Sequence, residues 1–204
     1  MVVICLLGDH GVGKTSLLQS TIHYLSDDMQ QYWNKYVVHK EDFSGEAIRR
    51  GVNNEIISST TLHPNRVIIG EYDSNRIHHI YSVGGHYSAI IVKMSIITIS
   101  KLSDHIIFVV SPDVPLESQF EYFEHLPFTP KELYVCINKM DLFENNGNLN
   151  DSKTFENKID EYLKEKTVRI KEFFHTCGHI ETAHPDLITC RENGIHMFIN
   201  IISK

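Results

Sequence analysis

One stretch near the N-terminus sets the architecture to expect: Gly8-Asp9-His10-Gly11-Val12-Gly13-Lys14-Thr15, which matches the pattern G-x-x-x-x-G-K-[ST]. Residues 2–7 before it form a β-branched apolar run, typical of a strand buried in a parallel sheet. Residues 16–24 after it carry leucine and isoleucine at helical spacing. A strand, a glycine-rich turn and a helix in this order predict a loop that binds phosphate.

The chemistry of this loop follows from its residue types. Glycines let backbone N–H groups curl around phosphate oxygens, and the N-terminus of the following helix favours negative charge there. The Lys14 side chain would reach the β- and γ-phosphates of a nucleotide, and the Thr15 hydroxyl would be a ligand of Mg²⁺. The residues expected to contact phosphate here are Asp9, His10, Gly11, Val12, Gly13, Lys14, Thr15 and Ser16.

A second motif, Asn138-Lys139-Met140-Asp141, follows directly on the apolar run 132–137. A carboxylate at the end of a strand can accept two hydrogen bonds, from the N1–H and the exocyclic amine of guanine. Adenine lacks this pair of donors, so a buried Asp141 carboxylate would be left unpaired against it. The motif therefore indicates that Asn138, Lys139 and Asp141 bind a guanine base.

The rest of the chain alternates between strand and helix patterns. Strands are expected at 66–72 and 77–83, joined as an antiparallel hairpin, and at 105–110, 132–137 and 187–189. Helices are expected at 116–126, 151–174 and 194–202, and at 88–100, where isoleucine content also fits a strand. Residues 27–60 are interpreted as an extended, partly helical insertion. This order predicts an α/β fold with a mostly parallel sheet.

Composition excludes several classes of protein. The 204 residues carry a formal net charge of −7, which argues against nucleic-acid binding through a basic face. No apolar run is long enough to span a bilayer, no signal peptide is recognisable, and no lipidation motif provides a membrane anchor. Four cysteines are too few for a disulfide-stapled scaffold. We therefore expect a cytoplasmic, acidic domain.

With these two motifs in order, the chain resembles the Ras-like small GTPase superfamily. The resemblance implies a three-layer P-loop GTPase fold, with a six-stranded, mostly parallel sheet, one antiparallel strand in the hairpin 66–83, and helices on both faces. It implies a single domain over 1–204, with insertions at about 27–58 and 145–185. GTP or GDP and Mg²⁺ are the implied ligands. Thr189, Cys190 and Arg191 resemble the S-A-K loop of this family, whose backbone contacts guanine.

The family's γ-phosphate box, D-x-x-G-Q, corresponds here to Ser82-Val83-Gly84-Gly85-His86. This segment is similar to the D-V-G-G-Q of Arf proteins and the D-L-G-G-H of Sar-type proteins, and closest to bacterial gliding-motility polarity GTPases and their archaeal relatives. Ser82 supplies no negative charge for Mg²⁺, so either metal affinity drops or another carboxylate substitutes. Gly85 retains the backbone N–H for the γ-phosphate.

His86 stands where the family has its water-orienting Gln, and a neutral imidazole can accept a hydrogen bond from water. The alternative is that His86 faces solvent. The resemblance also implies a threonine that binds Mg²⁺ and the γ-phosphate; Thr60 and Thr61 are both candidates, and Thr61 is favoured because Leu62 follows it. His10 either crowds the attacking water or points outward.

These residues support two functions. The first is a GTP/GDP switch with slow Mg²⁺-dependent hydrolysis, in which His86, Lys14 and Thr61 are catalytic and Thr15 and Thr61 hold the metal. The second is a nucleotide-binding interaction module with little or no hydrolysis. In either case we expect effector, GAP and exchange proteins to contact the loops around 55–65 and 84–92.

Overall fold

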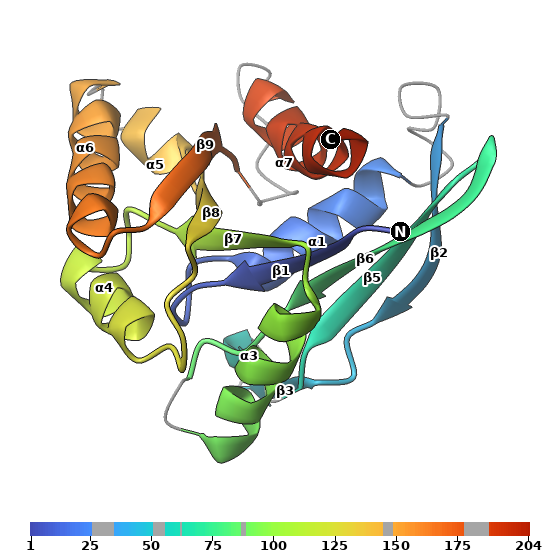
Figure 1. Ribbon diagram of the computed structural model, residues 1–204, viewed down its shortest axis with the longest axis horizontal. Helices are drawn as coiled ribbons and strands as arrows, with labels where there is room; N and C mark the ends of the chain where they lie inside the picture. The colour runs from blue at the N-terminus through green and yellow to red at the C-terminus, as the bar shows by residue number, and fades with distance from the viewer. Residues whose placement is uncertain (26–34, 51–55, 62, 87–88, 145–148, 178–187) are drawn as a thin grey trace.

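The protein is seen in a computed structural model that describes residues 1–25, 35–50, 56–61, 63–86, 89–144, 149–177 and 188–204. Its centre is a seven-stranded sheet with the strand order β2-β5-β6-β1-β7-β8-β9 (Figure 1). The strands of this sheet are β1 (Val3–Leu7), β2 (Tyr36–Asp42), β5 (Asn65–Glu71), β6 (Ser74–Ser82), β7 (His105–Val110), β8 (Glu132–Ile137) and β9 (Arg169–His175). A two-stranded sheet pairs β3 (Glu46–Arg50) with β4 (Ile56–Thr61).

One strand of the large sheet runs against its neighbours. β1 pairs in parallel with β6 and β7, and parallel pairing continues through β8 to β9. β5 is antiparallel to both of its neighbours, β2 and β6. The expected hairpin and its single antiparallel strand are therefore confirmed. The expected count of six strands is wrong, because residues 36–42, interpreted as part of an insertion, pair with β5 and extend the sheet.

Helices cover both faces of this sheet (Figure 1). They are α1 (Lys14–Tyr24), α3 (Ile90–Leu102), α4 (Leu116–Glu124), α5 (Asp141–Glu144), α6 (Leu149–Glu165) and α7 (Ile188–Ser203). α1 and α7 pack on one face, and α3, α4 and α6 pack on the other. Among the described helices, none has both the length and the apolar character that crossing a membrane requires.

The central strands show why three layers form. Ile4 and Leu6 of β1 belong to the core shared with α1 and α7, whereas Cys5 and Leu7 belong to the core shared with α3, α4 and α6. All four side chains are fully buried. Because successive side chains of a strand point to opposite faces, a strand covered on both faces needs an apolar residue at every position. The unbroken apolar run 2–7 is therefore a direct signature of the layered fold.

The expected helix 151–174 is wrong in its second half. α6 ends at Glu165, and β9 begins at Arg169. Between them, Thr167 adopts a left-handed φ of 58°, and the Val168 N–H donates to the Leu163 carbonyl at 2.9 Å. No glycine or proline marks this turn, so the charged amphipathic pattern concealed the end of the helix.

The expected strand 187–189 is also wrong. Ile188 is the first residue of α7, and residue 187 lies outside the described part of the chain. The strand at this edge of the sheet, beside β8, is β9. The expected helices at 88–100 and 116–126 and the strands at 105–110 and 132–137 are confirmed as α3, α4, β7 and β8.

Candidate functional site

The topology brings three chain segments to one edge of the sheet. The glycine-rich loop 8–13 follows β1, residues 138–141 follow β8, and residues 176–177 follow β9. These strands are parallel, so their carboxyl ends lie on the same side, where α/β sheets bind ligands. The two motifs that were recognised separately in the sequence therefore belong to one site.

The glycine-rich loop requires glycine at two positions. Gly11 and Gly13 have φ values of 83° and 89°, in the left-handed region that other residues rarely adopt. Gly13 also caps the N-terminus of α1, and a Cβ atom there would clash with Nδ2 of Asn138. The close approach of these two residues joins the loop after β1 to the motif after β8.

Lys14 lies under the loop and holds its backbone. Its side chain is buried, and Nζ donates hydrogen bonds of 2.8 Å to the carbonyl oxygens of Gly8 and Asp9. Burial lowers the pKa of Lys14 to about 8, although the negative charge of Asp9 offsets part of this effect. The Asp9 carboxylate is itself held by Ser118 of α4, whose Oγ donates to it at 2.6 Å.

Asn138 links the two motifs. It is almost fully buried, and its Nδ2 donates to the Val12 carbonyl at 2.9 Å. Its Oδ1 accepts a 3.1 Å hydrogen bond from Thr176 Oγ1, at the end of β9. Asn138 therefore ties the glycine-rich loop to β8 and β9 through one amide group.

Lys139 extends over the loop with an unusual backbone. Its φ is 60°, and its Nζ donates to the Gly11 carbonyl at 2.7 Å and to Asp113 at 2.6 Å. Burial would raise the pKa of Asp113, but hydrogen bonds from Lys139 and Ser111 outweigh it and lower this pKa. Both side chains are partly exposed, so this ion pair contributes to geometry more than to stability.

A cavity of about 310 Å³ opens between these groups. Its volume is at the lower end of what a small-molecule site needs. The residues that line it are Gly13, Ser16, Asp113, Asn138, Lys139, Asp141 and Leu142. Loop residues and the Asn138–Asp141 motif therefore face the same space.

The third segment of the site differs from the expected one. Thr189, Cys190 and Arg191 lie in the first turn of α7 and not in a loop after a strand, so their expected position is wrong. Thr176 and Cys177 occupy the end of β9 instead, and Cys177 Sγ lies 3.0 Å from Asp141 Oδ1. The pair Thr-Cys occurs in both places in the sequence. A strand recognised at 169–175 would have placed residues 176–177 beside Asn138 and Asp141.

The expected γ-phosphate box packs against the glycine-rich loop. A Cβ atom on Gly85 would clash with the backbone of Asp9 and His10. One residue earlier, a Cβ atom on Gly84 would clash with the carbonyl oxygen of Thr61, the last residue of β4. The structure thus brings Thr61, the glycine pair and the loop together, and only glycine allows this packing at 84 and 85.

His10 and His86 stack on each other. Their ring centroids are 4.4 Å apart, with 24° between the ring planes. Burial lowers the pKa of His10, and the neighbouring His86 and Lys14 lower it further, against an opposing effect of Asp9. Both histidines are exposed, so the stack lies at the protein surface beside the loop, and the lowered pKa favours the neutral form of His10 at pH 7.

One further polar residue contacts Thr15, and a second lies opposite it in the sheet. Asn65, which begins β5, is fully buried and its Nδ2 donates to Thr15 Oγ1 at 3.2 Å. Ser82 is its cross-strand partner, and the buried Ser82 hydroxyl has no hydrogen-bond partner in the described part of the structure. Hydroxyl and amide oxygens are donors that suit Mg²⁺. The described residues contain no group of three or more His, Cys, Asp or Glu side chains placed to hold a metal.

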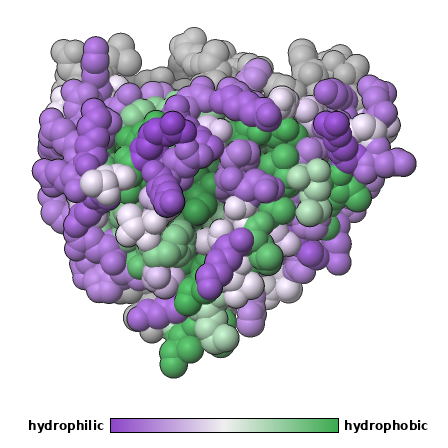
Figure 2. Space-filling model, viewed as in Figure 1, coloured by the Kyte–Doolittle hydropathy of each residue, from purple (hydrophilic) through white to green (hydrophobic). Residues whose placement is uncertain are grey.

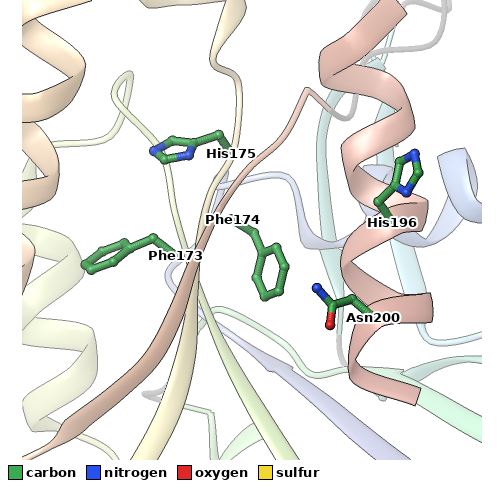
Figure 3. Close-up of a pocket in the computed structure, with 5 residues that line it drawn as sticks. All are labelled: Phe173, Phe174, His175, His196 and Asn200. Carbon is green, nitrogen blue, oxygen red and sulfur yellow. The ribbon is translucent and has the colours of Figure 1, made fainter. Parts of the chain in front are cut away.

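A second hollow, of about 400 Å³, lies between β9 and α7 (Figure 3). It is lined by Phe173, Phe174, His175, His196 and Asn200. Figure 3 shows Phe174 pointing from β9 toward α7, where His196 and Asn200 lie. His175 pairs with Glu156 at 3.1 Å. None of the motif residues reaches this hollow, so the cavity beside the glycine-rich loop is the better candidate site.

Solved structures share this fold. The bacterial selenocysteine-specific elongation factor EF-Sec aligns with a TM-score of 0.58 at 17% identity, over 99% of this chain and 28% of that one. SelB from Methanococcus maripaludis, in complex with the GTP analogue GppNHp, aligns with a TM-score of 0.54 at 13% identity, over 98% and 32%. A GTP-binding protein from Sulfolobus solfataricus, in complex with GDP, aligns with a TM-score of 0.51 at 19% identity, over 98% and 53%.

These alignments define the class of fold: this chain has the α/β fold of P-loop GTP-binding proteins. It spans between about a quarter and a half of the length of those chains. No protein-family model matches the sequence, and no curated protein matches it.

Proposed function

We propose that this chain binds GTP and GDP with Mg²⁺ and acts as a slow GTP-hydrolysing switch. The observation that carries the proposal is the meeting of the glycine-rich loop and the Asn138–Asp141 motif around one cavity. A phosphate-binding loop alone would suit many nucleotides. The carboxylate of Asp141 beside it favours guanine, because guanine presents two adjacent donors.

In this proposal each part of the site has a distinct role. The backbone N–H groups of the loop and the Lys14 ammonium bind phosphate oxygens, replacing the carbonyl contacts that Lys14 makes in the structure. Asn138 fixes the loop, and Asp141 together with the backbone at 176–177 binds the base. Thr15 and Thr61 would hold Mg²⁺, which supplies charge neutralisation for the β- and γ-phosphates.

His86 is proposed to orient the water that attacks the γ-phosphate. A neutral imidazole offers one nitrogen as an acceptor, and its stacking partner His10 is neutral at pH 7. The stack holds the His86 ring beside the loop that binds phosphate. Because Ser82 replaces a carboxylate, we expect this hydrolysis to be slow.

The loops around 55–65 and 84–92 are proposed to contact effector, GAP and exchange proteins. α3 follows the second of these loops and exposes apolar side chains at Ile90, Ile91 and Met94. Figure 2 shows hydrophobic surface at the lower tip of the molecule, where α3 lies in Figure 1. Exposed apolar surface of this kind is typical of a site that contacts other proteins.

The test of base recognition is the variant Asp141→Asn. Asparagine offers one acceptor and one donor, which match the N1–H and C2 carbonyl of xanthine and not the two donors of guanine. We expect GDP affinity to fall by about 10²-fold or more, with a gain for xanthosine diphosphate. Asp160→Asn on α6 is the matched control and should bind as wild type. Guanine selectivity that survives Asp141→Asn would refute the base assignment.

The test of hydrolysis is single-turnover cleavage of bound GTP by the wild type and by His86→Ala. We expect a measurable wild-type rate that falls about 10²-fold or more in the variant. His125→Ala, an exposed histidine at the end of α4, is the control. Tight binding without turnover in wild type would instead support the interaction module.

A further inference from the structure

A polar cluster lies at the first turn of α1, formed by the half-buried Thr15 and the buried Asn65 and Ser82. The Asn65 amide reaches Thr15 Oγ1 at 3.2 Å, across 50 positions of sequence. Asn65 and Ser82 are directly opposite in the β5–β6 register, and both are fully buried. The cluster therefore links Thr15, a proposed metal ligand, to Ser82, which stands where the Ras-like family has an aspartate.

This cluster has no negative charge of its own. The loop carboxylate Asp9 accepts hydrogen bonds from Ser118 Oγ and from the His10 N–H. Within the described ranges, acidic, histidine and cysteine side chains form no group of three or more that could hold a metal.

We propose that the Asn65 side-chain amide positions Thr15 and the hydration shell of Mg²⁺, in place of the carboxylate missing at Ser82. The inference rests on the proposed function, because it concerns the metal that accompanies the nucleotide. The Nδ2 group donates to Thr15 in the structure, and the same amide turned by 180° presents its oxygen to a metal-bound water. Asn65 is thus a positioning residue.

The chemistry of an amide predicts a specific property. An amide oxygen is neutral, so it holds a metal-bound water less strongly than a carboxylate does. The Mg²⁺ concentration at which nucleotide release is half slowed should therefore be higher than a carboxylate at position 65 would give, and it should fall when a carboxylate is introduced there. A purely structural role for Asn65, as a partner of the Thr15 hydroxyl, would predict loss of stability without any change in the Mg²⁺ dependence.

The experiment measures dissociation of a fluorescent GDP derivative from the full chain during a Mg²⁺ titration, with an EDTA sample as reference. The variants are Asn65→Ala, which removes the amide, and Asn65→Asp, which keeps its shape and adds a charge. Asn75→Ala, an exposed residue of the same hairpin, is the matched control. Thermal unfolding in EDTA establishes that each variant is folded.

The proposal expects a midpoint in Mg²⁺ that rises about 10–100-fold in Asn65→Ala, the range seen when groups around metal ligands are removed. It expects a midpoint that falls by about tenfold in Asn65→Asp, with dissociation in EDTA close to wild type in both variants. Unchanged Mg²⁺ midpoints in folded variants that still bind GDP would overturn the role of Asn65 and leave the proposed function standing. A wild type that retains no GDP at any Mg²⁺ concentration would overturn the proposed function and this inference together.

Discussion

Replacing Thr176 by valine tests the part of the site that the fold, rather than a motif, identifies. Thr176 is fully buried, and its Oγ1 donates to Asn138 Oδ1 at 3.1 Å while lying 3.2 Å from Cys136 Sγ. Valine has nearly the same shape, so the change removes the donor without opening a cavity. Loss of one partner of a buried hydrogen bond costs about 1–3 kcal/mol of the free energy of unfolding.

For a chain of this length, each kcal/mol lost lowers the unfolding midpoint by roughly 2–4 °C. Thermal unfolding followed by circular dichroism measures this shift, and titration with fluorescent GDP measures the weaker binding that follows from a less fixed Asn138. Thr176→Ser keeps the hydroxyl and should retain most of both properties. An unchanged midpoint together with unchanged GDP affinity in Thr176→Val would refute the assignment of β9 to this site.

Three other changes test the loop itself. Gly13→Ala should lower the free energy of unfolding by about 1–2 kcal/mol, because residue 13 has a left-handed φ, and it should also lower GDP affinity, because the new Cβ atom clashes with Asn138. Chemical denaturation measures the first effect and GDP titration the second. Values equal to wild type would contradict the role of this glycine. Bound phosphates should raise the pKa of Lys14 from about 8, so GDP binding takes up a proton. GDP affinity measured by calorimetry should therefore fall as pH rises from about 7 to about 9. In a Lys14→Met variant, GDP affinity should not change over this pH range. Gly85→Ala should push the box away from His10 and slow single-turnover hydrolysis while GDP binding remains, and an unaltered rate would show that this packing is irrelevant.

Local patterns were enough to predict the glycine-rich loop and the strands around it. The loop requires positive φ at Gly11 and Gly13, which the residue type itself indicates. The strands β1 and β7 lie in the centre of the sheet, so residues 3–7 and 106–110 appear in the sequence as continuous apolar runs. Both signals are contained in short segments, and tertiary contacts reinforce them rather than oppose them.

Tertiary structure alone decided which distant residues meet. The boundary between α6 and β9 depends on the pairing of β9 with β8, and that pairing places Thr176 and Cys177 in contact with Asn138 and Asp141. The register of β5 against β6 places Asn65 opposite Ser82. Contacts between segments far apart in the chain are set by strand register and packing, and no periodicity in one sequence encodes which partner a side chain will face.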